Sequence, residues 1–175
     1  MTRAGWLVCT GALSNAALLL AVYPELVPML EVVMMGGSMG TGNTGPMQEF
    51  NCQVDPEAAK MVFDCGVALV MVPLDDTYRS VFGFIHPPLH DPCAVAFVIA
   101  PQLFKVRELR VDIETVSPYT AGQTVCDVWR QTGRPANCRV AVTMDVAQFW
   151  DLQLAALAEA DVASPLNRLT IPEGG

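Results

Sequence analysis

Three polar side chains that suit a hydroxyl-rich ligand lie within a short glycine-rich stretch, GTGNTGPMQEFN, residues 40–51. Asn43 and Asn51 each offer amide donors and an acceptor, and Glu49 offers a carboxylate. A carboxylate with neighbouring amides fits vicinal hydroxyls, whereas Glu49 would repel a phosphate group. In an extended segment, Glu49 and Asn51 would face the ligand while Phe50 anchored the opposite side. The stretch therefore indicates a sugar site, with a solvated loop as the open alternative.

A second polar group lies in PPLHDPCAV, residues 87–95, where a helix is predicted to begin. One interpretation makes Asp91 a ligand for a hard cation, with His90 pointing into the same cleft. The other makes Asp91 an ordinary helix N-cap, which is a common role for aspartate. These residues alone leave both interpretations open.

The elements that would position these groups alternate between strands and helices. Continuous apolar runs predict buried parallel strands at residues 6–9, 31–35 and 67–74. Helices are predicted to start after residue 13, at residue 55 and at residue 91. Ligands of open α/β sheets bind outside the carboxyl ends of the strands. The glycine-rich loop that follows residue 35 therefore lies where a site is expected.

Beyond residue 104 the sequence becomes rich in strand-like segments with partly alternating faces, and an amphipathic helix follows at residues 146–160. The predicted strands are KVRELRVDIET, QTVCDVWR and CRVAVTMD, and the tail SPLNRLTIPEGG is expected to be loose. The predicted fold class is therefore α/β. It consists of a mostly parallel (Rossmann-like) sheet flanked by helices, with a short β-rich C-terminal part.

The composition of the chain limits the classes of protein to which it can belong. The chain has 175 residues, of which 52% are hydrophobic and 16% charged, enough for one domain with a sizeable core. A net charge of −8 without a basic run argues against nucleic acid as a partner. No uninterrupted apolar run reaches membrane-spanning length, so a cytoplasmic location is predicted, with secretion as the minor alternative. The six cysteines lack CxxC spacing, and buried free thiols are expected rather than disulfides or a zinc site.

Six blocks of the sequence together resemble the inosine–uridine preferring nucleoside hydrolases, from about Trp6 to Glu159. They are CTGALSNAALLL, VVMMGGSMGTGN, EFNCQVDPEAAKMVF, MVPLDDT, HDPCAVAFVI and VDIET…GQTVCD, in the family's order. The resemblance implies hydrolysis of the N-glycosidic bond of purine and pyrimidine ribonucleosides to free base and ribose. It also implies a calcium ion (Ca2+) that holds the ribose and the attacking water, a role in purine nucleoside catabolism, and association into homo-oligomers.

The resemblance also assigns roles to residues by position. The residues that match the ribose-binding positions are Asn43, Glu49 and Asn51. Asp91 matches a calcium-ligating aspartate, and Thr10 matches the residue whose main-chain carbonyl binds the ion. His90 matches a histidine that assists departure of the base in some members, which makes it the expected catalytic residue.

Two departures from the family pattern shape the expectations for activity. The aspartate-rich DxDxxxDD segment, which supplies further calcium ligands and the general base, has no counterpart in this sequence. We therefore expect residues 1–175 to form a single, partial nucleoside hydrolase domain, incomplete at the N-terminus, with an incomplete calcium ligand set. The helical insertion that forms a wall of the base pocket is also missing between Asp75 and His90. The alternative to an enzyme is a catalytically inactive remnant that acts through a partner.

Overall fold

A computed structural model describes residues 5–74 and 89–165 of the chain. The chain divides into two compact units, Met1–Met144 and Asp145–Gly175. The expectation of a single domain stays a prediction, and each unit is described by itself below.

The first unit is built on a five-stranded sheet with the strand order β1-β2-β3-β7-β4. Its strands are β1 (Gly5–Cys9), β2 (Leu30–Met35), β3 (Ala68–Val72), β7 (Cys138–Met144) and β4 (Phe104–Leu109). The pairs β1–β2, β2–β3 and β3–β7 are parallel, and only β4 runs antiparallel to its neighbour β7. The prediction of a mostly parallel α/β sheet is therefore confirmed.

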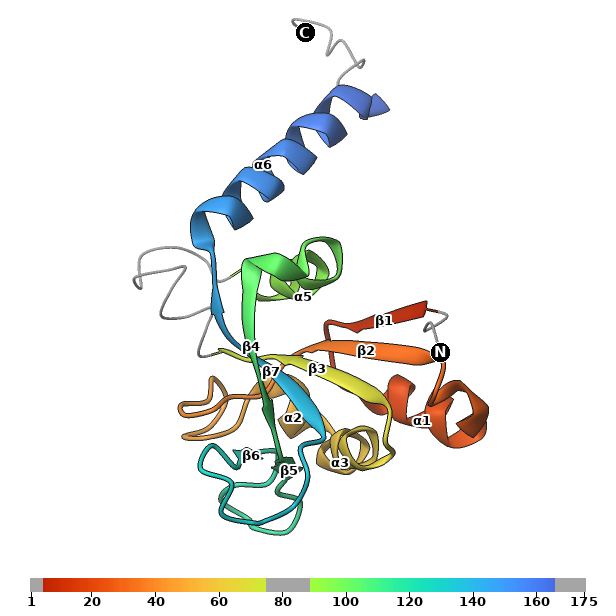
Figure 1. Ribbon diagram of the computed structural model, residues 1–175, viewed down its shortest axis with the longest axis vertical. Coiled ribbons are helices and arrows are strands. Elements are labelled where there is room, and N and C mark those ends of the chain that lie inside the picture. Colours follow the sequence, from red (N-terminus) through yellow and green to blue (C-terminus); the bar gives the residue numbers. More distant parts are fainter. Residues whose placement is uncertain (1–4, 75–88, 166–175) are drawn as a thin grey trace, which may run out of the picture. The chain divides into compact units, whose positions relative to one another are not determined.

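Helices cover both faces of this sheet (Figure 1). On one side lie α1 (Ser14–Val22) and α3 (Pro56–Asp64), and on the other lies α5 (His90–Ile99). Alternate strand residues serve the two faces, as the pleat of a strand requires. Val32 and Met34 of β2 join the core beneath α1 and α3, so their neighbours in the strand point toward α5. Burial on both faces explains why β2 and β3 read as continuous apolar runs.

Short elements complete the first unit. Two 3-10 turns, Pro24–Leu26 and Pro101–Leu103, precede β2 and β4, and helix α2 (Phe50–Val54) precedes α3. Strands β5 (Val111–Ile113) and β6 (Thr124–Cys126) form a separate two-stranded antiparallel sheet, and β5 packs against α3.

The sequence predicts one strand over KVRELRVDIET, whereas the structure divides it into β4 and β5. The side chain of Asn137 causes the division. Its Oδ1 accepts a hydrogen bond from Val111 N at 2.8 Å, and its Nδ2 donates to Val111 O at 2.9 Å. The same Nδ2 also donates to Phe63 O of α3 at 2.9 Å. Because this amide takes up the backbone groups of Val111, the chain leaves the five-stranded sheet at that point.

One charged side chain is buried in the apolar strand β2. Glu31 is 3% exposed and forms an ion pair with Arg139 of β7. The guanidinium of Arg139 also lies 5.8 Å from the ring centroid of Phe97 in α5. A buried carboxylate needs such a partner, because an unpaired charge in the core would be strongly destabilising.

The second unit contains helix α6 (Val146–Ala163). Asp145 caps its N-terminus by accepting a hydrogen bond from Gln148 N at 3.1 Å. The predicted helix at residues 146–160 is therefore confirmed, and most of the predicted loose tail lies outside the described residues. None of the helices in the described part of the chain is long and apolar enough to cross a membrane.

All six cysteines lie in the described ranges and are free thiols. Cys52, Cys93 and Cys138 are buried, as expected for small apolar side chains, while Cys65 is exposed. The expectation of burial therefore holds for half of the cysteines.

Candidate sugar-binding site

The candidate site begins where β2 ends, in the glycine pair Gly36–Gly37. Gly37 has a φ of +76°, a conformation that side chains with a Cβ rarely adopt. A Cβ at this position would lie 2.8 Å from Met71 Sδ and 2.9 Å from Thr124 Cγ2. Gly37 is thus required by both its backbone angle and the close packing on either side. The loop stays bound to the edge of the sheet through the hydrogen bond from Leu74 N to Gly37 O, 3.0 Å long.

Glu49 is the central carboxylate of the site and is 2% exposed. Its Oε2 accepts hydrogen bonds from Gly37 N at 2.9 Å, Asn51 N at 3.0 Å and Cys52 N at 3.3 Å. Glu49 is therefore the N-cap of α2. Among the described residues no donor contacts its other oxygen, Oε1, which leaves that oxygen for a ligand.

The charge of Glu49 is set by opposing effects. Burial raises the pKa of the Glu49 carboxyl above its ordinary value, and the negative charge of Asp91 raises it further. The backbone donors act in the opposite direction but do not cancel the burial effect.

Asn51 links the ends of two neighbouring strands. Its Nδ2 donates to Met35 O, the last residue of β2, at 3.0 Å. The same group donates at 3.3 Å to the carbonyl of Thr10, which directly follows β1. Because a carbonyl oxygen has two lone pairs, Thr10 O keeps one for another partner. The structure thus brings Thr10, Glu49 and Asn51 together, and the roles that the resemblance assigns to them stay predictions.

The expected extended conformation around Phe50 is wrong. Residues 50–54 form helix α2, and the side chain of Phe50 is 54% exposed rather than anchored. The reason is capping. Glu49 binds the first amides of the helix, and Asn43 Oδ1 accepts a hydrogen bond from Phe50 N at 2.9 Å. Asn43 thus closes the glycine-rich loop onto the helix while remaining exposed itself.

His90 and Asp91 lie in the first turn of α5, which packs on β1 and β2. The N-cap of α5 is Leu89, and no side chain caps it, so the interpretation of Asp91 as a helix cap is wrong. His90 is half-buried. Burial lowers the pKa of its imidazole, and the charge of Asp91 partly opposes that effect.

Calcium takes about 6–8 oxygen ligands, and the described residues do not supply a complete shell. The candidate ligands are the carbonyl of Thr10 and the carboxylate of Asp91. Residues 5–74 and 89–165 contain no group of three or more His, Cys, Asp or Glu side chains placed to hold a metal ion. Residues 75–88 lie outside the described part of the chain.

Residues outside the predicted set also support the glycine-rich loop. Thr124 of β6 forms two hydrogen bonds with the backbone of Ser38, and Gln48 Nε2 donates to Tyr119 O at 2.5 Å. Both contacts join segments more than 70 residues apart in sequence. The only signal available was the GQTVCD block, which carries Thr124 but gives no hint of what it touches.

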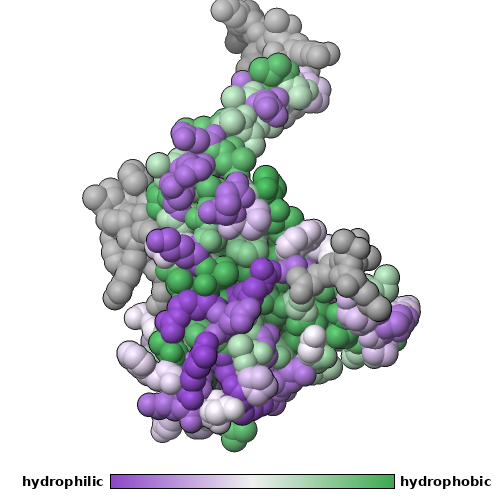
Figure 2. Space-filling model, viewed as in Figure 1, coloured by the Kyte–Doolittle hydropathy of each residue, from purple (hydrophilic) through white to green (hydrophobic). Residues whose placement is uncertain are grey.

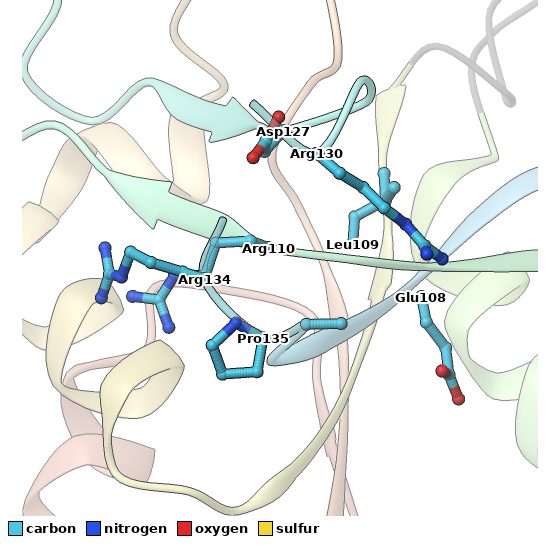
Figure 3. Close-up of a pocket in the computed structure, with 8 residues that line it drawn as sticks. Glu108, Leu109, Arg110, Asp127, Arg130, Arg134 and Pro135 are labelled. Atoms are coloured by element: carbon cyan, nitrogen blue, oxygen red, sulfur yellow. The ribbon is translucent and has the colours of Figure 1, made fainter. Parts of the chain in front are cut away.

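A different pocket of about 280 Å³ lies at the start of β7, near the amino-terminal edge of the parallel strands (Figure 3). Hydrophilic side chains gather over this part of the first unit in the space-filling view (Figure 2). Two of the arginines that line the pocket, Arg110 and Arg134, are engaged in ion pairs. Arg110 pairs with Asp112 and, at 3.0 Å, with Asp64, and Arg134 pairs with Asp112 at 2.9 Å. None of the predicted site residues lines this pocket.

Comparisons with known proteins agree on one family. The family model described as inosine-uridine preferring nucleoside hydrolase matches residues 2–82 and 75–151. A probable ribonucleoside hydrolase of Dictyostelium discoideum is 40% identical over 191 residues, covering 86% of this chain and 56% of that protein. The pyrimidine-specific ribonucleoside hydrolase RihA of Shewanella baltica is 38% identical over 198 residues, covering 93% of this chain and 62% of that protein.

A solved structure is similar as well. The purine-preferring ribonucleoside hydrolase of Gardnerella vaginalis superimposes with a TM-score of 0.76 at 26% identity, covering 83% of this chain and 58% of that one. The chain thus spans between 56% and 62% of the length of these relatives.

The alignments also contain residues of the relatives that have no counterpart in this chain. The aligned stretches of 191 and 198 residues are longer than the whole chain of 175 residues. The two parts of the family match meet at residues 75–82, between β3 and α5. Both observations agree with the absence of an insertion between Asp75 and His90.

Proposed function

Because this chain belongs to the inosine-uridine preferring nucleoside hydrolase family, we propose that the protein hydrolyses the N-glycosidic bond of purine or pyrimidine ribonucleosides to free base and ribose. The observation that supports this best is the buried carboxylate of Glu49, whose three backbone donors all bind Oε2 and leave Oε1 toward a ligand. Relatives described as pyrimidine-specific and purine-preferring both occur, so the proposal names no preferred base.

In this proposal the site residues bind ribose and stabilise its charge. Glu49 Oε1 accepts a hydrogen bond from a ribose hydroxyl, and the amide of Asn43 offers a further hydrogen-bonding group to the sugar. Asn51 binds both Glu49 and Thr10 and so fixes their relative positions. Cleavage passes through an oxocarbenium-like state in which the sugar becomes positive. A fixed carboxylate and hydroxyl contacts that strengthen in that state lower the barrier.

His90 is proposed as the proton donor to the departing base. Its lowered pKa makes the imidazolium a stronger acid than an ordinary histidine, although a smaller fraction carries the proton at neutral pH. Asp91 and the Thr10 carbonyl are proposed as two calcium ligands. The cytoplasmic location, a role in purine nucleoside catabolism, and assembly into a homo-oligomer stay predictions.

A second candidate function is nucleoside binding without hydrolysis. The observation that favours it is the incomplete set of metal ligands in the described residues, together with the lack of an assigned base to deprotonate water. The sugar contacts of Glu49 and Asn51 would remain in that case. The two candidates differ only in turnover.

The experiment measures binding and turnover on the same preparation. Inosine and uridine are titrated by calorimetry, and release of free base is followed with calcium present. Asn51→Ala is compared with Asn15→Ala, which changes an exposed asparagine of α1. Base release that Asn51→Ala abolishes and Asn15→Ala keeps would support the hydrolase. Binding without release would support the second candidate, and the absence of both would overturn both.

A further inference from the structure

The glycine-rich loop is held on its inner side by a distant segment, the connection between β5 and β6. Gln48 Nε2 of the loop donates to Tyr119 O at 2.5 Å. Gly122 packs so closely on helix α2 that a Cβ there would lie 2.5 Å from Gln53 Cα. This connection therefore packs against the loop and α2 together.

The strongest contact of this kind is made by Thr124, which is 3% exposed. Its Oγ1 accepts a hydrogen bond from Ser38 N at 2.9 Å and donates one to Ser38 O at 2.6 Å. A single hydroxyl thus satisfies both backbone groups of Ser38, which is itself 2% exposed. A hydroxyl can make both bonds because its oxygen accepts one hydrogen bond and donates another.

The methyl group of Thr124 contributes separately. It lies on one side of Gly37, and Met71 Sδ lies on the other, each within 3 Å of where a Cβ would stand. The amide of Gly37 is one of the three donors to Glu49 Oε2, at 2.9 Å. Thr124 therefore holds the residue after Gly37 by hydrogen bonds and Gly37 itself by contact.

We propose that Thr124 is a positioning residue for Glu49, acting through Ser38 and Gly37 to aim the carboxylate at the bound sugar. The sugar as ligand rests on the proposed function, whereas the coupling of Thr124 to Glu49 does not. Loss of the hydroxyl leaves both backbone groups of Ser38 without a partner in a buried place. The loop then relaxes and the Gly37 amide moves away from Glu49.

The test uses the full chain and three variants. Thr124→Val keeps the shape but loses the hydroxyl, and Thr124→Ser keeps the hydroxyl but loses the methyl. Thr143→Val is the control, because Thr143 is an exposed threonine of strand β7, which belongs to the other sheet. Should Thr124→Val fail to fold, Thr124→Ala removes the same hydroxyl and leaves room for a water molecule.

Two measurements need no ligand. Amide exchange of Gly37 and Ser38 should accelerate about tenfold or more in Thr124→Val. The pKa of Glu49, followed by carboxyl 13C NMR, should rise further because a donor to its charged form is lost. Thr143→Val should leave the Glu49 titration unchanged, and Thr124→Ser, which keeps both hydrogen bonds to Ser38, should change it less than Thr124→Val does. An unchanged Glu49 titration in the variant without the hydroxyl would overturn the proposal.

The third measurement is the affinity for D-ribose by calorimetry. We expect about a tenfold loss in Thr124→Val and rescue in Thr124→Ser, with equal affinity in the control. If unaltered protein binds no ribose while the Glu49 titration responds to the hydroxyl, the proposed function fails and the positioning role stands. If ribose binds equally well in all variants, the positioning role fails alone.

Discussion

The two ends of the parallel sheet differ in the partners of their carboxylates. At the amino-terminal end, carboxylates are matched by guanidiniums: Asp112 by Arg110 and Arg134, and the buried Glu31 by Arg139. At the carboxyl end, the donors that Glu49 finds within residues 5–74 and 89–165 are backbone amides, all on one oxygen. A carboxylate paired with a guanidinium stabilises the fold but has little hydrogen-bonding capacity left for a ligand. A carboxylate whose donors all bind one oxygen can still accept hydrogen bonds at the other. Chemistry is therefore expected at the carboxyl end of the sheet, where Glu49 is bound by backbone amides on one oxygen.

The largest expected effect is a difference in stability between glycine substitutions at the two ends of the sheet. Gly37→Ala should lower the free energy of unfolding by about 3 kcal/mol, because it combines a positive φ with overpacking against Met71 and Thr124. Gly133→Ala is the matched control, since Gly133 has a φ of +66° but nothing within 4 Å of an added Cβ. It should lose only about 1 kcal/mol. Urea unfolding measures both, and equal losses would contradict the tight packing around Gly37.

The second effect concerns ligand binding. Glu49→Gln should weaken ribose and nucleoside binding about 10- to 100-fold, because a charge-assisted hydrogen bond becomes a neutral one. Glu57→Gln, which changes an exposed glutamate in the first turn of α3, should bind as well as the unaltered protein. Calorimetry with inosine and uridine provides the affinities. Unchanged binding in Glu49→Gln would remove Glu49 from the site.

The third change is aimed at the opposite end. Asp112→Asn should lower the free energy of unfolding by about 1 kcal/mol, because it weakens a partly exposed ion-pair network around Arg110. Nucleoside affinity should stay the same, since this network lies away from the glycine-rich loop. A combined urea and calorimetry series would show whether the two ends are independent. A large loss of affinity would mean that they are coupled.

The smallest effect is a difference in titration. The pKa of Glu49 is raised, chiefly by burial, and that of Asp112 is lowered, chiefly by the hydrogen bond from Arg110. On acidification Glu49 should therefore gain its proton first, so sugar affinity falls while the Asp112 network is intact. The linked stabilities have opposite signs. Asp112 contributes stability that is lost as pH falls through its lowered pKa, whereas protonation of Glu49 favours the fold as pH falls through its raised pKa. Carboxyl 13C NMR tests the order, and titration of Asp112 at a higher pH than Glu49 would refute it.

Local pattern was sufficient for most of the fold. The apolar runs at residues 31–35 and 67–74 predicted two central strands because burial on both faces leaves no polar alternation. The pattern failed at residues 49–51, where Glu49 caps a helix that was expected to be extended. It also failed at Arg110, because the side chain of Asn137 takes up the backbone of Val111 and divides the strand. Both errors arise from side chains that bind backbone, which periodicity does not describe.

The candidate site was predicted less evenly. Hydrogen bonds join Thr10, Glu49 and Asn51, to which the resemblance assigns roles, and those roles stay predictions. Thr124 was missed, because its partner Ser38 lies 86 residues away and nothing in a local stretch shows such a contact. A threonine in a short strand has no distinctive pattern of its own. Residues that support a site without contacting the ligand are therefore harder to predict than residues that face it.

The pairing of β3 with β7 has a consequence for the order of folding. Val70 lies opposite Arg139, so the strand next to β3 in space is nearly 70 residues later in the chain. While the chain is being synthesised, β3 can pair with β2 but keeps its other edge open until residues 138–144 have emerged. Pairing over such a separation is slow, because a long loop must close before any contact compensates for the lost entropy. During that interval an apolar strand edge is exposed, and this is the stage at which the nascent chain is most prone to aggregate or to need a chaperone.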